Sequence, residues 1–263
     1  MKKTITSCLL IALFLISYAH EYILIAENFK VKKGDTLNVH LFVADGFNIE
    51  MERPLQASIT KNYSLETSNG TIDLLQEGKT GSLPILQRPV DFEGLGLIHI
   101  ERDFAKITLE NNKFLDYLKE DHIENIQIDA SKQKEQKERY ARYIKCLVQS
   151  GTSNSNQLYK KQIGQKFEII LLNNPYQLKI GNQINAQIFF EGKPLVNKVI
   201  TIRNRTGGEH ATKQIARTNE KGICSFKLNR QGDWFIHATH MIKSTDQSAA
   251  DWESHWTSYS FGM

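Results

Sequence analysis

Two strand-like stretches close the sequence: GDWFIHATHM at residues 232–241 and DWESHWTSYSF at residues 251–261. Side chains alternate between the two sides of a β-strand, so His240 shares a face with Trp234 and Ile236. That face is otherwise typical of a core. We therefore expect the His240 imidazole to be partly buried, and a buried imidazole needs a partner.

The rest of the chain continues this β pattern. Short apolar runs, spaced about 8 to 12 residues apart and separated by turn signals, predict a mainly β protein with two immunoglobulin-like β-sandwich domains. We place the first domain at residues 20–150, a linker rich in Ser and Asn at 151–158, and the second domain at 159–263.

The first domain is expected to contain a helical insertion at about 111–139. Apolar residues recur there at helical spacing, and a stretch rich in Lys, Gln and Glu without Gly or Pro follows. The pattern predicts two helices, over 111–120 and 122–139.

The two halves resemble each other. Residues 29–38 align with 176–185, and residues 94–99 align with 232–237. These alignments indicate a duplicated sandwich, with the insertion in the first copy.

The N-terminus has the pattern of a secretory signal peptide. Lys2 and Lys3 precede an apolar run at residues 9–16, and Ser17-Tyr18-Ala19 offers small residues at the positions a signal peptidase reads. We expect residues 1–19 to be removed, so that the mature chain begins at His20 and is periplasmic or secreted.

Composition excludes several classes of partner. Removal of the two leader lysines lowers the formal net charge from +4 to +2, which gives no electrostatic case for nucleic acid. No later segment has the length of apolar sequence that spans a membrane. Cys146 and Cys224 are expected to be buried free thiols, although export would allow a disulfide.

The candidate site is a metal site at the two chain ends. An N-terminal His20 would offer an amine beside its imidazole, which suits a late transition metal. His240 would join it, together with Glu253 and His255, which face the same way on a strand. The competing interpretation is that His240 is a core histidine. Metal affinity is expected to fall below about pH 6 to 7, when protons compete for these ligands.

The other histidines are assigned different roles. His99 and His237 occupy matching positions in the two halves, which favours packing roles. His122 and His210 are expected to be exposed and inert.

Several segments resemble an exported bacterial family of domains of unknown function named for the M subunit of nickel transport complexes. The similar segments are His20-Glu21-Tyr22, residues 114–118, 138–145, 174–176 with Gly181, 192–195, 232–234, His240-Met241 and 250–254. The resemblance implies an association with nickel and cobalt uptake, with a membrane transporter as partner. Ile23 stands where the family usually has tryptophan.

These features predict a non-enzymatic, exported protein that binds a transition metal ion, nickel or cobalt, with copper favoured by affinity. The sequence contains no Gly-x-Ser-x-Gly, His-Glu-x-x-His or phosphate-binding glycine loop. Two alternatives stay open. One is a structural or adhesion module, and the other is a copper oxidase, which would need a substrate groove beside the metal.

Overall fold

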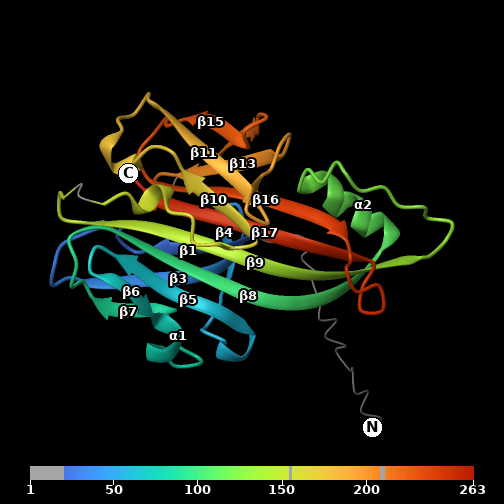
Figure 1. The fold of residues 1–263 in the computed structure, drawn as a ribbon, viewed down its shortest axis with the longest axis horizontal. Helices are drawn as coiled ribbons and strands as arrows, with labels where there is room; N and C mark the ends of the chain where they lie inside the picture. The colour runs from blue at the N-terminus through green and yellow to red at the C-terminus, as the bar shows by residue number, and fades with distance from the viewer. Residues whose placement is uncertain (1–20, 154–155, 208–210) are drawn as a thin grey trace, which may run out of the picture.

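The computed structural model describes residues 21–153, 156–207 and 211–263, and within these ranges the strands form three sheets in three layers (Figure 1). The central sheet has nine strands: β14 Thr212–Arg217, β13 Val199–Arg205, β16 Asp233–Lys243, β17 Trp252–Gly262, β9 Glu135–Ser150, β8 Gly94–Glu110, β5 Thr60–Thr67, β6 Gly70–Asp73 and the short β2 Lys30–Val31 beside β9.

A smaller sheet covers each face of the central sheet. The N-terminal sheet contains β1 Glu21–Ala26, β3 Thr36–Asp45, β4 Asn48–Glu52 and β7 Leu86–Pro89. The C-terminal sheet contains β10 Phe167–Leu171, β11 Gln183–Phe190, β12 Lys193–Pro194 and β15 Ile223–Lys227. The helices are α1 Leu74–Glu77 and α2 Asn111–Glu120, with 3₁₀ turns at Ala57–Ile59, Leu158–Lys160 and Pro175–Gln177.

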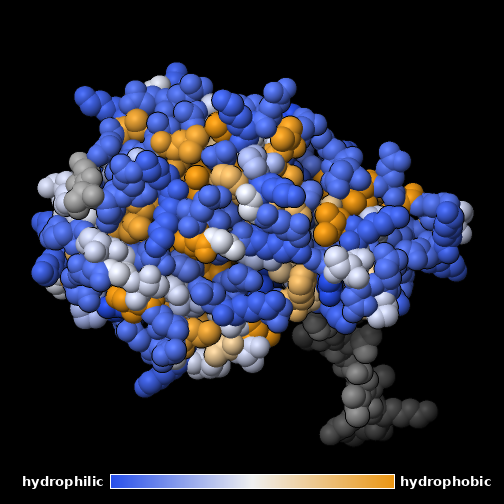
Figure 2. All heavy atoms as spheres, viewed as in Figure 1, coloured by the Kyte–Doolittle hydropathy of each residue, from blue (hydrophilic) through white to orange (hydrophobic). Residues whose placement is uncertain are grey.

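Two hydrophobic cores lie between the layers. One joins the N-terminal sheet to the face of the central sheet that carries Ile98 and Ile144, and the other joins the C-terminal sheet to the face that carries Leu97 and Tyr259. The face of the molecule in Figure 2 is mostly hydrophilic. The predicted mainly β chain of β-sandwiches is therefore confirmed, with the addition that the two sandwiches share one sheet.

The strand pairings of the two halves repeat. In the N-terminal sheet β3 pairs with β1, β4 and β7, and in the C-terminal sheet β11 pairs with β10, β12 and β15. In the central sheet the order β6-β5-β8-β9 meets the order β14-β13-β16-β17, and β9 lies parallel to β17. A pseudo-twofold axis along the strands relates the halves, because such an axis keeps β9 and β17 parallel and exchanges the two faces. The duplication predicted from the sequence is thus visible in the topology.

The helical insertion is shorter than expected. Helix α2 forms over 111–120 as predicted, and its buried Phe114 and Tyr117 pack against Trp252 and Trp256. The second expected helix, over 122–139, is wrong. Residues 121–134 form turns and coil, and β9 already begins at Glu135 because its first residues pair with the end of β8. This tertiary pairing overrides the helical propensity of Lys, Gln and Glu.

Smaller expectations have mixed outcomes. Cys146 and Cys224 are buried free thiols, as predicted. None of the helices in the described ranges has the length and apolar character needed to cross a membrane. The expected signal peptide at 1–19, His20, His210 and part of the 151–158 linker lie outside the described residues.

Candidate metal site

Strands β16 and β17 bring three of the predicted site residues together. His240 lies directly opposite His255 in the antiparallel pair, and Glu253 is on the same face of β17. The Phe190 ring of β11 contacts both imidazoles, with ring centroids 4.5 Å from His240 and 5.1 Å from His255. This face of the central sheet points toward the C-terminal sheet.

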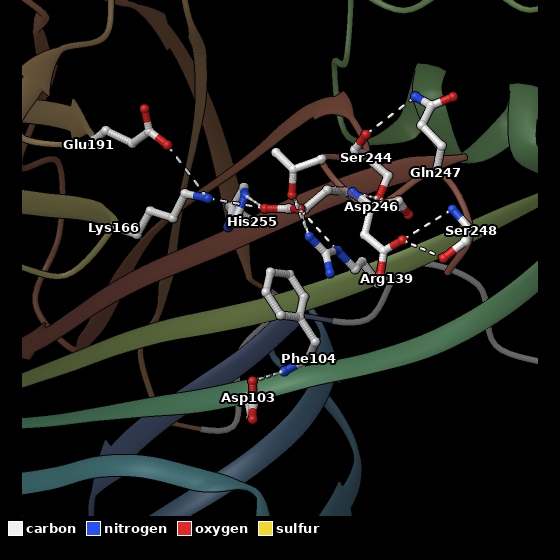
Figure 3. Close-up of polar contacts among 12 residues, drawn as sticks. Asp103, Phe104, Arg139, Lys166, Glu191, Ser244, Asp246, Gln247, Ser248 and His255 are labelled. Carbon is white, nitrogen blue, oxygen red and sulfur yellow. Dashed lines mark hydrogen bonds and ion pairs between the residues drawn. The ribbon is translucent and has the colours of Figure 1, made fainter. Parts of the chain in front are cut away.

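The Glu253 carboxylate is held by two cationic side chains. Arg139 Nε donates to Oε2 at 2.9 Å, and Lys166 Nζ donates to Oε1 at 3.0 Å. Figure 3 shows Arg139 and Lys166 approaching from different directions beside His255. Burial alone would raise the pKa of Glu253, but these hydrogen bonds outweigh it and lower the pKa to about 2. A metal ion would have to displace these cations from the carboxylate.

His255 is also engaged on both sides of its ring. Its Nδ1 lies at hydrogen-bond distance, 3.3 Å, from the Tyr143 hydroxyl, and its Nε2 lies 3.0 Å from Glu253 Oε1, an ion-pair distance without hydrogen-bond geometry. Burial, with Lys166 nearby, lowers the pKa of this fully buried imidazole to about 3. His255 is therefore neutral at pH 7 and fixed in place.

His240 differs from its partner because none of the described residues hydrogen-bonds to its ring. Burial, reinforced by the charge of Lys198, lowers the pKa of His240 to about 4, so the ring is a neutral nitrogen donor at pH 7. The imidazole lines a pocket of about 250 Å³ between the 122–125 segment after α2 and the 195–199 segment before β13.

His122 lines the same pocket. This residue closes α2 with a left-handed backbone, φ 52°, and the next amide, Ile123 N, donates to Leu118 O at 2.8 Å. Helices usually place glycine at such a position, because a side chain there adds strain. The Nε2 of His122 is buried without a hydrogen-bond partner, and burial lowers the pKa of the ring.

The expectation that His122 is exposed is therefore wrong, because the residue is half-buried. Helical spacing predicts that a second helix begins at residue 122, but the segment Asp121–Asn125 forms turns and coil. In the fold it is tied to the edge of β16, because Asn125 Nδ2 donates to Met241 O at 2.8 Å. A non-glycine residue at the helix end is the sequence signal that could have identified His122.

Lys198 adds a positive charge to the pocket. Its Nζ donates to His122 O at 3.2 Å, and burial lowers its pKa to about 8 despite nearby Asp121 and Glu124. Among the described residues no group of three or more His, Cys, Asp or Glu side chains is arranged to hold a metal ion. The donor set that fits a metal here is two neutral imidazoles, with the remaining positions left to other ligands.

The fourth predicted ligand, His20, lies outside the described residues. The described chain enters at Glu21 in β1, on the other face of the central sheet from His240. Ser258 Oγ donates to Tyr22 O at 2.7 Å there, and Ser258 alternates with His255 and Glu253 along β17.

A family model for a domain of unknown function, DUF4198, matches residues 17–242. The chain belongs to the DUF4198 family. The DUF4198 match includes His122, Lys198 and His240, and it ends before β17, which carries Glu253 and His255. The family description names no metal.

Other comparisons add little to the DUF4198 assignment. A search of curated proteins matches none to this chain. Among solved structures, the D0–D1 domain of intimin aligns over 91% of this chain and 97% of its own, at 10% identity and a TM-score of 0.21. A similarity at that TM-score carries no argument about function.

Proposed function

We propose that this DUF4198 protein binds a transition metal ion, nickel or cobalt, through the imidazoles of His122 and His240. The observation that supports this proposal is that two neutral imidazoles line one pocket, one of them with a buried nitrogen that has no hydrogen-bond partner. Neutral imidazole suits nickel, cobalt and copper, and copper ranks highest by intrinsic affinity.

The pocket suits transient capture. Two protein nitrogens leave coordination positions open, and about 250 Å³ is room for several waters at ~30 Å³ each. Glu124 and Asn125 also line the pocket and offer oxygen atoms. In the proposed role the protein works outside the cytoplasm, without catalysing a reaction, and presents the ion to a membrane uptake system.

Titration calorimetry with nickel, cobalt and copper tests the proposal. The variants His240→Ala and His122→Gly should each weaken binding by at least tenfold, about 1.4 kcal/mol. His122→Gly should also stabilise the fold by ~1 kcal/mol, because glycine relieves the left-handed strain. A loss of affinity in a more stable protein cannot be attributed to unfolding.

His40→Gln is the matched control, because that ring lies between Glu27 and Glu52, away from the pocket. Unchanged affinity in both pocket variants would leave the structural or adhesion module as the better interpretation. A further pair of proteins, one beginning at His20 and one with an added N-terminal glycine, tests whether the His20 amine contributes.

A further inference from the structure

The pseudo-twofold axis gives the histidine pair a counterpart on the opposite face of the central sheet. Arg102 of β8 lies as many residues after Gly94 as His240 of β16 lies after Gly232, the residue before that strand. Arg102 lies directly opposite Arg142 of β9, as His240 lies opposite His255. Two like charges directly opposite each other in a sheet are destabilising.

Aromatic rings hold these arginines in place. The Arg142 guanidinium lies 3.8 Å from the centroid of the Tyr22 ring and 4.4 Å from that of Tyr140. Arg102 lies 5.4 Å from the Tyr22 centroid, and its Nη2 donates to Gln56 Oε1 at 2.6 Å. These contacts fix the guanidinium planes, but they supply no negative charge.

A third arginine, Arg53, adds to the same positive field. Burial lowers the pKa of Arg102, Tyr22 opposes this shift, and the charges of Arg142 and Arg53 add to it, so both of these arginines repel Arg102. Each has a buried nitrogen without a hydrogen-bond partner: Nε of Arg53, Nη1 of Arg102 and Nε of Arg142. Arg102 as a residue is only 4% exposed.

The described part of the chain offers these arginines no carboxylate at ion-pair distance. None of the ion pairs among the described residues includes Arg53, Arg102 or Arg142, and the buried Glu138 acts on Arg142 only from beyond ion-pair distance. A buried charge without a partner costs several kcal/mol, so uncompensated clusters of this kind call for a ligand. Arg53 and Arg142 are half-buried, as are Tyr22 and Tyr140, so the cluster reaches the surface.

We propose that Arg53, Arg102 and Arg142 form a binding site for a multiply charged oxyanion, the phosphate or sulfate group of a small molecule. Three guanidinium groups favour a dianion over a single carboxylate, and arginine N–H groups match the geometry of oxyanions. The burial of Arg102 restricts the site to a compact group. This site is independent of the proposed metal site, because the two lie on opposite faces of the central sheet.

The test uses inorganic phosphate and sulfate as probes, with chloride at matched ionic strength as the reference. Phosphate should raise the melting temperature of the full chain in a saturable way, and calorimetry should show a single site. The variant Arg53→Gln should weaken phosphate binding about tenfold. In phosphate-free buffer it should melt at or above the wild-type temperature, because it relieves repulsion. A purely structural Arg53 would give the opposite change in melting temperature.

Arg88→Gln is the matched control, since Arg88 pairs with Glu77 and Asp91 away from the cluster. Should Arg53→Gln fold poorly, Arg142→Lys keeps the charge, loses the planar stacking and should still weaken phosphate binding. Equal responses to phosphate and chloride, or full phosphate affinity in Arg53→Gln, would overturn the proposal. Binding to phosphatidylglycerol vesicles without a response to free phosphate would also overturn it, because the group would then come from a lipid surface.

Discussion

The two halves of the sheet carry opposite chemistry at equivalent positions. In the C-terminal half the cross-strand pair is His240 and His255, both neutral at pH 7 because burial lowers their pKa values. In the N-terminal half the pair is Arg102 and Arg142, both charged. The duplicated backbone places a cross-strand pair at the equivalent position of each half. The side chains of that pair are imidazoles in one half and guanidinium groups in the other.

The residues two positions before His255 and Arg142 also differ in charge between the two halves. Two residues before His255 stands Glu253, 1% exposed, which forms ion pairs with Arg139 and Lys166. Two residues before Arg142 stands Tyr140, which stacks on the guanidinium and brings no charge. The cations on the histidine side therefore have carboxylate partners, whereas no described carboxylate lies at ion-pair distance from Arg102 or Arg142.

The largest effect should come from removing the Glu253 carboxylate beside the histidine pair. Glu253→Gln leaves Arg139 without an ion-pair partner and leaves Lys166 with only the exposed Glu191, which should cost about 3 kcal/mol of unfolding free energy in urea titrations. The equivalent change in the other half, Tyr140→Phe, keeps the ring over Arg142 and should stay within about 0.5 kcal/mol. Similar losses for the two variants would show that the halves are not electrostatically different.

The second effect is the dependence of stability on pH. The pKa of an unfolded histidine is near 6.5, whereas that of folded His255 is about 3 and that of His240 about 4. Between these values the unfolded state binds more protons, so stability falls as the pH falls. Each such imidazole contributes a slope of about 1.4 kcal/mol per pH unit.

His255→Gln should reduce that slope by about one histidine's share between pH 6 and 4.5, measured by urea unfolding at several pH values. Arg142→Gln, at the equivalent position, is the control and should leave the slope unchanged, because arginine stays protonated in both states. An unaltered slope in His255→Gln would mean that its imidazole is already charged in the folded protein.

Much of this comparison could be predicted from sequence periodicity. Alternation placed His240 on a core-facing side, and the two-residue spacing placed Glu253 and His255 together, as the structure shows. Matching glycines, Gly94 and Gly232, revealed the duplication that relates the two pairs. Local patterns suffice where a residue's environment follows from its own strand.

Other features depend on contacts between distant segments. The run from Glu135 reads as a helix because its Lys, Gln and Glu have helical propensity, yet pairing with β8 makes it a strand. His122 is predicted to begin a second helix, whereas in the fold Asn125 ties its segment to β16. Arg102 and Arg142 read as ordinary surface charges, because the covering Tyr22 comes from a strand on another sheet.

The smallest effect concerns how each site responds to alkali. Lys198 should lose its proton near pH 8, where Asp121, Glu124 and Arg217 are its charged neighbours, so metal affinity at the His122 and His240 pocket should rise between pH 7 and 9. Solvent and salt screen the charge of Lys198, so its loss should change the free energy of metal binding by roughly 1 kcal/mol.

The variant Lys198→Met should therefore bind nickel several-fold more tightly than the wild type at pH 7 and show a flatter pH profile in calorimetry. Lys213→Met, which removes an exposed charge that also acts on His122, is the control and should change affinity less. Phosphate binding at the arginine cluster should not change over this range, because the guanidinium groups stay charged. A parallel change in both sites would point to a general loosening of the fold at high pH and would break the contrast between the two halves.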